Sequence, residues 1–366
     1  MLKAMKRSLL GRLPSLFSWR ISIFAGSFVL IGLVAVVTSH AAGPYVATEA
    51  ENGTISGAAT TASDATASDG QYAALDAPTP TPTGSSTCPL PAYPNPSCTG
   101  LPSGTTFTNT VNGDYTVSSG GQIIDAWHIT GTLIIQAANV VIKNSQIDDH
   151  IDNEAAPSSS FTINDSTVGP TTCPTEGWPS INGHHFTANR VHLRNHQDSV
   201  DMVGDAITIA DSLFQPCYQP ASVVGSDGFH SDGVQDQCST TCTGITLNHD
   251  TIDARAYYGG QSWGNSALNL GSQADGLHIR SVTLKNNLFM GGSYTTDLRW
   301  DAGLSWIVTG NSWVQGAWTY APISTESTCS NQTWGVDTAS NLPNRIVVID
   351  ANYNVTSVAN TTGCVD

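Results

Sequence analysis

Short segments in which apolar and polar positions alternate recur through residues 87–366. Eight octets align without gaps; each starts on an alternating apolar stretch, carries Asn, Asp or Gly near its fifth or sixth position, and ends on an apolar residue. They are VVIKNSQI (140–147), FTINDSTV (161–168), FTANRVHL (186–193), ITIADSLF (207–214), ITLNHDTI (245–252), VTLKNNLF (282–289), WIVTGNSW (306–313) and IVVIDANY (346–353). Successive octets start 21, 25, 21, 38, 37, 24 and 40 residues apart. A period of this length predicts a coil of short parallel strands, each turn burying a small apolar set against its neighbours.

The pattern decides between fold classes. No heptad or 3.6-residue period is visible, which excludes a helical solenoid. A β-sandwich also has short strands, but it would not return the same octet at the same period. We therefore predict an all-β fold, a single-stranded right-handed parallel β-helix.

A second set of strands is expected just before the octets. The segments are TLIIQ (132–136), PSING (179–183), SVDMV (199–203), GVQDQ (233–237), ALNLG (267–271) and TDLRW (296–300). Their apolar residues would point inward, which leaves an outward column of Asp201, Gln235, Asn269 and Arg299. Because stacked strands are about 4.8 Å apart, this column would form a polar stripe along one sheet.

Two of these strands follow matching strings, HQDSVD (196–201) and HSDGVQ (230–235), 34 residues apart. Stacking would place His196 over His230 and Asp198 over Asp232. Two stacked carboxylates repel each other, so one pKa should rise unless a cation lies between them. The paired repeat favours a functional site. The alternative is a structural ladder in which these side chains bond backbone N–H groups.

Other polar and aromatic positions separate into two groups. Asn144, Asp165, Asp211, Asn286 and Asn311 lie at the octet bends, where short side chains tolerate unusual backbone angles, and we assign them structural roles. Tyr257, Tyr258 and Trp263 lie in the long insertion before the Asn269 strand and could form an exposed aromatic wall. Trp306 and Trp313 occupy octet ends and are expected in the core.

The amino-acid composition and the net charge exclude some classes of function. The 366 residues include 13 Lys and Arg against 29 Asp and Glu, 24 of them Asp, and the formal net charge is −16. Richness in Asp and Gly favours turns and strands. The acidic balance argues against a nucleic-acid partner, which would require clustered Lys and Arg.

Residues 1–42 have the layout of a secretory signal peptide: basic residues, an apolar run from Ile21 to Val37, then SHAA. An uncleaved N-terminal anchor is the alternative. After cleavage the net charge would be −21, and no later segment is apolar enough to span a membrane. We therefore expect a secreted or cell-surface protein, a monomer, without a membrane partner.

The eight Cys all lie at or beyond Cys88, and an even number suits disulfides in an oxidising compartment. Cys238 and Cys242 are close enough to pair locally, and Cys88–Cys98, Cys173–Cys217 and Cys329–Cys364 are further candidates, although the sequence does not fix the connectivity. Zinc binding is the alternative, against which the wide scatter of the spacings counts.

Residues 43–77 contain EAENG (49–53) and ASDGQY (67–72), which resemble the opening of carbohydrate-binding modules of families 6 and 35. The resemblance implies a structural calcium at Glu49 and Glu51. It covers about thirty residues of a β-sandwich that needs on the order of a hundred, so we interpret the segment as a relic or a mobile tail. Residues 78–86 form a Pro/Thr linker, and residues 87–366 form the β-helix domain.

The octets, of the form TI-x-N/D-N/S-x-apolar, follow the segments CPLPAYPNPS and TGLPSGTTF. Together with the secreted layout they resemble bacterial proteins of the pectate-lyase-like superfamily over most of residues 87–366. That superfamily includes polysaccharide lyases, glycoside hydrolases, epimerases, esterases and adhesins. The resemblance implies an extracellular polysaccharide bound along the polar stripe.

The first functional hypothesis is a polysaccharide lyase that performs β-elimination on a uronic-acid polymer. Calcium would be held by Asp198, Asp201 and Asp232, His230 or Arg299 would be the base, and His196 would assist. Gln235, Asn269, Tyr257, Tyr258 and Trp263 would contact the glycan. The net charge of −21 would repel a polyanion, so this hypothesis requires the calcium ion.

Two alternatives stay open. A glycoside hydrolase would use Asp201 and Asp232 as its carboxylate pair and would not need a charged substrate. A glycan-binding surface protein or adhesin would use the same stripe without catalysis.

Overall fold

The computed structural model describes residues 59–63, 71–75, 87–225, 228–239, 241–255, 257–258, 261–262, 264–270, 281–298, 305–325 and 333–362. The chain divides into two compact units, Met1–Thr79 and Pro80–Asp366. In the first unit, β1 (Ala59–Ser63) and β2 (Gln71–Leu75) pair antiparallel. The predicted signal peptide, Glu49, Glu51 and the linker lie outside the described residues.

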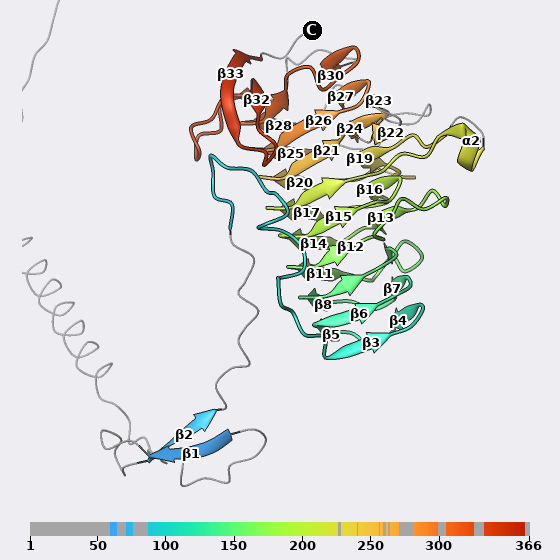
Figure 1. Ribbon diagram of the computed structural model, residues 1–366, viewed down its shortest axis with the longest axis vertical. Coiled ribbons are helices and arrows are strands. Elements are labelled where there is room, and N and C mark those ends of the chain that lie inside the picture. Colours follow the sequence, from blue (N-terminus) through green and yellow to red (C-terminus); the bar gives the residue numbers. More distant parts are fainter. Residues whose placement is uncertain are drawn as a thin grey trace, which may run out of the picture. The chain divides into compact units, whose positions relative to one another are not determined.

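The second unit is a parallel β-helix built from three sheets, and the chain visits them in the same order in every turn (Figure 1). Sheet 1 contains β4 (Tyr115–Val117), β7 (Leu133–Ile135), β10 (Ile151–Asp152), β13 (Pro179–Gly183), β16 (Asp198–Met202), β19 (Asp232–Asp236), β24 (Ser266–Leu270), β27 (Tyr294–Leu298) and β30 (Ala321–Thr325). Sheet 2 contains β5 (Ile123–Asp125), β8 (Val140–Lys143), β11 (Phe161–Asn164), β14 (Phe186–Asn189), β17 (Ile207–Ala210), β20 (Ile245–Asn248), β25 (Ser281–Lys285), β28 (Ser305–Thr309) and β31 (Thr333–Gly335).

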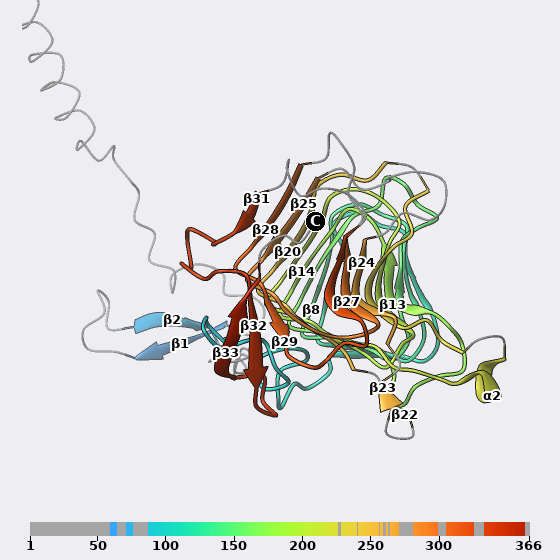
Figure 2. The same ribbon diagram turned by 90° about the horizontal axis from the view of Figure 1, so that it is seen from above.

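Sheet 3 completes each turn. It contains β3 (Asn109–Val111), β6 (Trp127–Ile129), β9 (Gln146–Ile147), β12 (Thr167–Val168), β15 (His192–Arg194), β18 (Leu213–Gln215), β21 (Thr251–Ala254), β26 (Leu288–Gly291), β29 (Ser312–Val314), β32 (Arg345–Ile349) and β33 (Val355–Thr361). Unlike its predecessors, β33 runs antiparallel to its neighbour, β32. Two excursions, α2 (Ala221–Val224) and the hairpin β22–β23 (Tyr257–Tyr258 and Gln261–Ser262), leave the coil between sheet 3 and sheet 1 and project beyond it (Figure 2).

Seven of the eight predicted octets are confirmed. Each spans a sheet 2 strand, a bend and a sheet 3 strand, and their first residues pair in register from turn to turn, as Val140 does with Phe161. The eighth octet is wrong, because Ile346 pairs in sheet 3 with Trp313, the last residue of the octet before it. Its alternating apolar pattern belongs to β32 alone. One further octet, residues 122–129, was missed because it begins with Gln122.

The bend of each octet needs a left-handed residue at the fifth position. These residues have φ between +46° and +72° in eight successive turns: Ala126, Asn144, Asp165, Arg190, Asp211, His249, Asn286 and Gly310. Asn, Asp and Gly adopt this conformation at the least steric cost, which explains the sequence preference. The structural roles predicted for Asn144, Asp165, Asp211 and Asn286 are confirmed for the backbone.

The sixth octet position forms a buried polar ladder, in which each backbone N–H donates to the side chain of the next turn. Asp250 N–H donates to Asn287 (2.9 Å), Asn287 N–H to Asn311 (3.0 Å), and Asn311 N–H to Asn344 (2.9 Å). Ser212 N–H donates to Asp250 in the same way (2.9 Å). The ladder therefore satisfies backbone groups that the bend removes from the sheets, and Asn311 has the structural role that was predicted for it.

Asp250 is the one carboxyl among the ladder residues named above, and burial raises its pKa well above the ordinary value. A raised folded-state pKa means that stability is full below the unfolded-state pKa and falls as the pH rises toward the folded-state pKa. Asp250→Asn should therefore raise Tm at pH 7 and change it little near pH 3. Each pKa unit corresponds to about 1.4 kcal/mol, and each kcal/mol to about 2–4 °C in a domain of about 150–250 residues.

Circular-dichroism melting at both pH values measures this effect. Asn fits the position because the next three rungs are Asn, each of which donates its amide to a backbone carbonyl. Asp125→Asn, at a half-exposed surface position, is the control. An equal rise in Tm at pH 3 and pH 7 would contradict the explanation by buried charge.

The core lies inside the three sheets and consists of inward side chains stacked turn upon turn. Val200, Val234 and Leu268 are fully buried in sheet 1, and the rings of Phe161 and Phe186 stack at 5.1 Å between their centroids in sheet 2. Trp306 and Trp313 are also fully buried in this core, as predicted.

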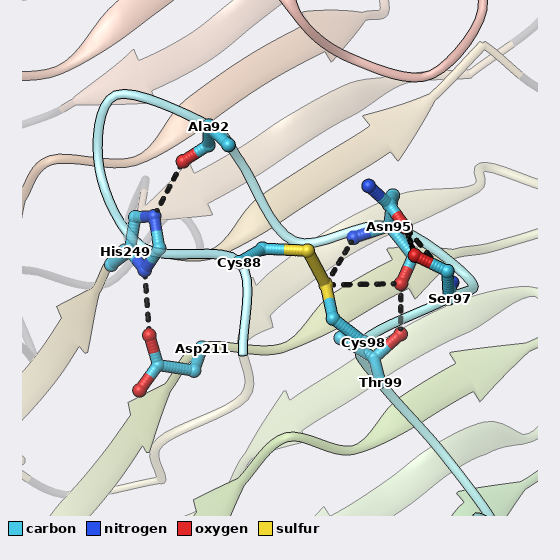
Figure 3. The surroundings of a disulfide bond; sticks show 8 residues. All are labelled: Cys88, Ala92, Asn95, Ser97, Cys98, Thr99, Asp211 and His249. Atoms are coloured by element: carbon cyan, nitrogen blue, oxygen red, sulfur yellow. Dashed lines mark hydrogen bonds and ion pairs between the residues drawn. A yellow bond between two sulfur atoms is a disulfide. The ribbon is translucent and has the colours of Figure 1, made fainter. Parts of the chain in front are cut away.

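The segment before the first turn is clamped onto the coil (Figure 3). A disulfide joins Cys88 to Cys98, and the ring of His249 bonds both the carbonyl of Ala92 (2.9 Å) and the carboxyl of Asp211 (2.6 Å). The contacts tie this segment to turns that are more than 100 residues away in the sequence.

Two further disulfides, Cys173–Cys217 and Cys238–Cys242, are present, so three of the predicted pairings are confirmed. Cys329 and Cys364 lie outside the described residues. Disulfides of this number indicate an oxidising compartment. Among the described residues, no helix is long and apolar enough to cross a membrane.

Candidate functional site

The outer face of sheet 1 carries a polar column along the coil. The register aligns Asp152, Asn182, Asp201, Gln235, Asn269, Asp297 and Ser324 in successive strands. Asp201, Gln235 and Asn269 were predicted there. Asp152 was missed because the two-residue strand β10 shows too little alternation to be recognised. Asn182 lies in the predicted strand 179–183 but was not assigned to the column.

The prediction for Arg299 in this column is wrong, because Asn269 pairs with Asp297. The error arises from a polar inward residue: Thr296 is fully buried and accepts a hydrogen bond from the indole of Trp313 (3.1 Å). A pattern of alternating apolar residues cannot reveal such a position. Arg299 itself lies outside the described residues.

Asp198 and Asp232 begin neighbouring strands and come together as predicted. The backbone N–H of Asp232 donates to Asp198 Oδ1 at 2.6 Å. The Asp232 carboxylate accepts further bonds from the hydroxyl of Ser266 (2.7 Å) and the amides of Asn265 (3.1 and 3.2 Å) and Asn269 (3.4 Å). The last of these bonds places the Asp232 carboxylate beside the outward column.

The three aspartates form one electrostatic group, the carboxyl cluster of Asp198, Asp201 and Asp232. Burial, together with the charges of Asp201 and Asp232, raises the pKa of Asp198 well above its ordinary value. Burial, followed by the charges of Asp232 and Glu154, raises the pKa of Asp201 to about 7.

Burial also raises the pKa of Asp232 to about 6, against the hydrogen bonds from Ser266, Asn265 and Asn269, which lower it. The cluster therefore retains protons near neutral pH. The pKa values belong to the interacting group of carboxyls as a whole.

The two histidines of the matching strings have different surroundings. His196 is 2% exposed, and its Nε2 atom lies 3.7 Å from a carboxyl oxygen of Asp149. Burial lowers the pKa of His196, which favours the neutral ring. His230 is exposed and follows the excursion that carries α2. The ring of His196 is therefore buried and that of His230 exposed, although the matching strings predicted that they would stack. The difference goes with the insertion that carries α2, which enters the chain between Cys217 and β19, directly before His230.

The predicted sugar-facing aromatics are only partly placed. Tyr257 and Tyr258 form β22 in the hairpin that precedes β24. Trp263 lies outside the described residues.

Three aromatic side chains that the sequence did not single out lie where sheet 1 strands begin. Trp178 directly precedes β13, Tyr294 is the first residue of β27, and Tyr320 directly precedes β30. All three are exposed large side chains. Trp178 and Tyr294 could have been found from their positions just before the predicted strands 179–183 and 296–300, whereas no strand was predicted after Tyr320.

The described basic side chains all lie away from sheet 1. Arg190, Arg255 and Lys143 each pair with a neighbouring Asp at sheet 2, sheet 3 or the bend between them. The other described Lys and Arg residues, Arg194, Lys285 and Arg345, also belong to sheets 2 and 3. The described part of the sheet 1 face is therefore acidic or neutral.

The carboxyl cluster does not have the donor set of a calcium cage, which needs six to eight oxygen ligands. Asp198 accepts bonds from Asp232 N–H and from Gln197, and both oxygens of Asp232 accept protein donors. Within the described ranges, no group of three or more His, Cys, Asp or Glu side chains is arranged to hold a metal ion. We therefore derive no chemical step through calcium.

Comparisons with protein-family models, with curated proteins and with solved structures found no match. The geometry and the electrostatics of the sheet 1 face are therefore the features that indicate a function.

Proposed function

We propose that the protein is a secreted enzyme that hydrolyses glycosidic bonds of a polysaccharide, with Asp201 and Asp232 as its reacting carboxyls. The observation that carries this proposal is the pair of neighbouring carboxyls of Asp201, which is partly buried, and Asp232, which is fully buried, with pKa values raised to about 7 and about 6. Glycoside hydrolysis uses one protonated and one ionised carboxyl across the scissile bond. The resemblance of the octets to the pectate-lyase-like superfamily supports a polysaccharide substrate.

The surroundings suggest different roles for the two carboxyls. Asp201, whose pKa is raised by burial and by the charges of Asp232 and Glu154, would protonate the leaving oxygen as the general acid. Asp232, held by Ser266, Asn265 and Asn269, would act as the base or the nucleophile. Asp198 would be a positioning residue, because its carboxyl accepts the backbone N–H of Asp232. Gln235 and Asn269 would bond sugar hydroxyls.

The second candidate is β-elimination on a uronate polymer, and the exposure of His230 two residues before Asp232 favours it as an accessible base. His196 would assist, as first hypothesised. Arg299 lies outside the described residues, and calcium is left out of this candidate because the carboxyl cluster lacks the free donors to hold it. The third possibility is a protein that binds a glycan without cleaving it, and the experiment must distinguish it from the two enzymes.

A panel of neutral and uronate polysaccharides, incubated with and without a chelator, tests these proposals. New reducing ends without ultraviolet absorbance indicate hydrolysis, and absorbance from unsaturated ends indicates elimination. Elimination that stops when the chelator is added would show that this reaction needs a metal ion. Binding without any product would overturn both enzymatic proposals.

The hydrolase proposal predicts a narrow pH optimum. Asp232 must be ionised and Asp201 protonated, so kcat should rise as the pH increases through about 6 and fall as it passes about 7. The measurement is kcat between pH 4 and 9 on the neutral glycan that the panel identifies. Activity that continues to rise up to pH 9 would contradict the assignment of Asp201 as the acid.

A further inference from the structure

Aromatic side chains lie on both sides of the carboxyl cluster, at the edge where sheet 1 strands begin. Trp178 is 51% exposed, Tyr294 37% and Tyr320 69%. Large aromatic rings are normally buried, so three exposed rings at one edge of one sheet require an explanation.

Trp178 is held rigidly although half of it is exposed. Its indole stacks on the ring of His150 with 5.3 Å between centroids and 11° between planes. The His150 ring bonds Asp149 (3.0 Å), whose second oxygen accepts the hydroxyl of Thr132 (3.0 Å). One face of the indole is therefore supported by a partly buried hydrogen-bonded network, which leaves the other face open to a ligand.

Tyr294 and Tyr320 form the second aromatic group. Their ring centroids are 5.5 Å apart and the rings are inclined by 45°. Tyr294 pairs along the sheet with Ala321, the residue after Tyr320. The two rings therefore belong to neighbouring turns and form one aromatic surface.

The register fixes these groups relative to the aspartates. Pro179, directly after Trp178, pairs with Asp198. Asp232 pairs with Ser266 in β24, and β24 pairs in turn with β27, whose first residue is Tyr294. Because strands are about 4.8 Å apart, Tyr294 lies about 10 Å beyond Asp232 along the coil, whereas Trp178 lies beside Asp198 on the other side.

The charge of this face indicates which glycan it accepts. The described residues of sheet 1 include no Lys or Arg, and the outward column contributes Asp152, Asp201 and Asp297. A uronate polymer would meet like charge here, whereas the apolar C–H face of a neutral pyranose can stack on aromatic rings and its hydroxyls can bond Asn and Gln.

We propose that Trp178 on one side and the Tyr294–Tyr320 pair on the other are binding subsites for a neutral pyranose glycan that crosses sheet 1 along the coil axis. The location of the cleavage point between them rests on the proposed function. A polysaccharide that is bound on both sides of the carboxyl cluster is cleaved at internal bonds, so the early products are oligosaccharides of mixed length.

Binding is tested with the full chain carrying Asp232→Asn, so that cleavage does not interfere. Affinity electrophoresis in xylan, glucomannan and mixed-linkage β-glucan is compared with polygalacturonate. Trp178→Ala should weaken the binding of a neutral glycan about 10-fold, as should the double variant Tyr294→Ala/Tyr320→Ala, while Trp178→Phe should retain most of the affinity.

Phe107→Ala is the matched control, because Phe107 also stacks on a histidine, His128, at 5.1 Å, but belongs to the sheet 3 side. Unchanged affinity in the Trp178 and tyrosine variants, a preference for polygalacturonate, or no binding to any neutral glycan would each overturn the inference. Melting curves of each variant show whether it is folded, and the double variant Tyr294→Ala/Tyr320→Ala keeps the inference falsifiable if Trp178→Ala unfolds.

The two proposals can fail separately. Neutral glycan that is bound through these aromatics but never cut by the wild-type chain would refute the hydrolase proposal and leave the subsites standing. Cleavage of a neutral glycan with unaltered KM in the aromatic variants would refute the subsites alone.

Discussion

Asp232→Asn is expected to lower kcat on the cleaved glycan by about 10²–10⁴-fold, the usual contribution of a positioned acid or base. The change removes the ionisable group but keeps the size of the side chain, so KM should change far less. Asp232 is fully buried and accepts bonds from Ser266, Asn265 and Asn269, and an amide would face some of these donors with its own N–H groups. Because burial raises the pKa of Asp232, the amide also removes a buried charge at neutral pH, so Tm should change little.

Two further variants make the result interpretable. Asp201→Asn should lose activity to a similar extent, because each carboxyl depends on the protonation state of the other. Asp125→Asn, which removes a half-exposed carboxyl on sheet 2, should leave kcat unchanged. Full activity in Asp232→Asn would eliminate the carboxyl cluster as the active site, whatever the other variants show.

Gly169→Ala is expected to cause the largest loss of stability, more than about 4 kcal/mol, a size reserved for severe local clashes. Gly169 follows β12 with φ of +114°, and a Cβ atom there would overlap the carbonyl oxygen of Arg194 in the next turn. Backbone on both sides would have to move, because the oxygen belongs to the sheet 3 strand β15. Urea unfolding followed by tryptophan fluorescence gives the free energy of unfolding.

Gly121→Ala separates steric contact from backbone strain. Gly121 also has a positive φ of +70°, but an added Cβ would meet nothing within 4 Å. Its cost should be the strain of a left-handed residue, about 1–2 kcal/mol. An equal loss of unfolding free energy in Gly169→Ala and Gly121→Ala would show that the contact between successive turns at Gly169 does not cause the destabilisation.

The fold could be predicted because its periodic signal is local. Alternating strands and a left-handed fifth residue recur within each octet, so a short window contains the bend that Asn144 or Asp165 makes. The prediction failed at the end of the coil, where Ile346 alternates like an octet but belongs to a single strand. Alternation identifies a strand, and only the bend that follows identifies a turn of the coil.

The site could be predicted only where it repeats in the sequence. Asp198 and Asp232 were found together because their strings match, and the register confirms that they adjoin. Arg299 was misplaced because Thr296 points inward and satisfies its hydroxyl by hydrogen bonding. Trp178 was missed because its support by His150 joins residues 28 apart that no repeat relates.

The antiparallel strand β33 has a consequence for assembly. The last strand of a parallel sheet leaves a row of backbone donors and acceptors that another chain can extend, which is a route to fibres. In sheet 3 the chain turns back after β32, and β33 pairs beside it in the antiparallel direction with two register shifts. The direction and the spacing of the backbone donors and acceptors therefore both change at this edge of the sheet. A second molecule cannot continue sheet 3 as another parallel turn, and the number of stacked turns is thus limited by a strand that the protein itself supplies.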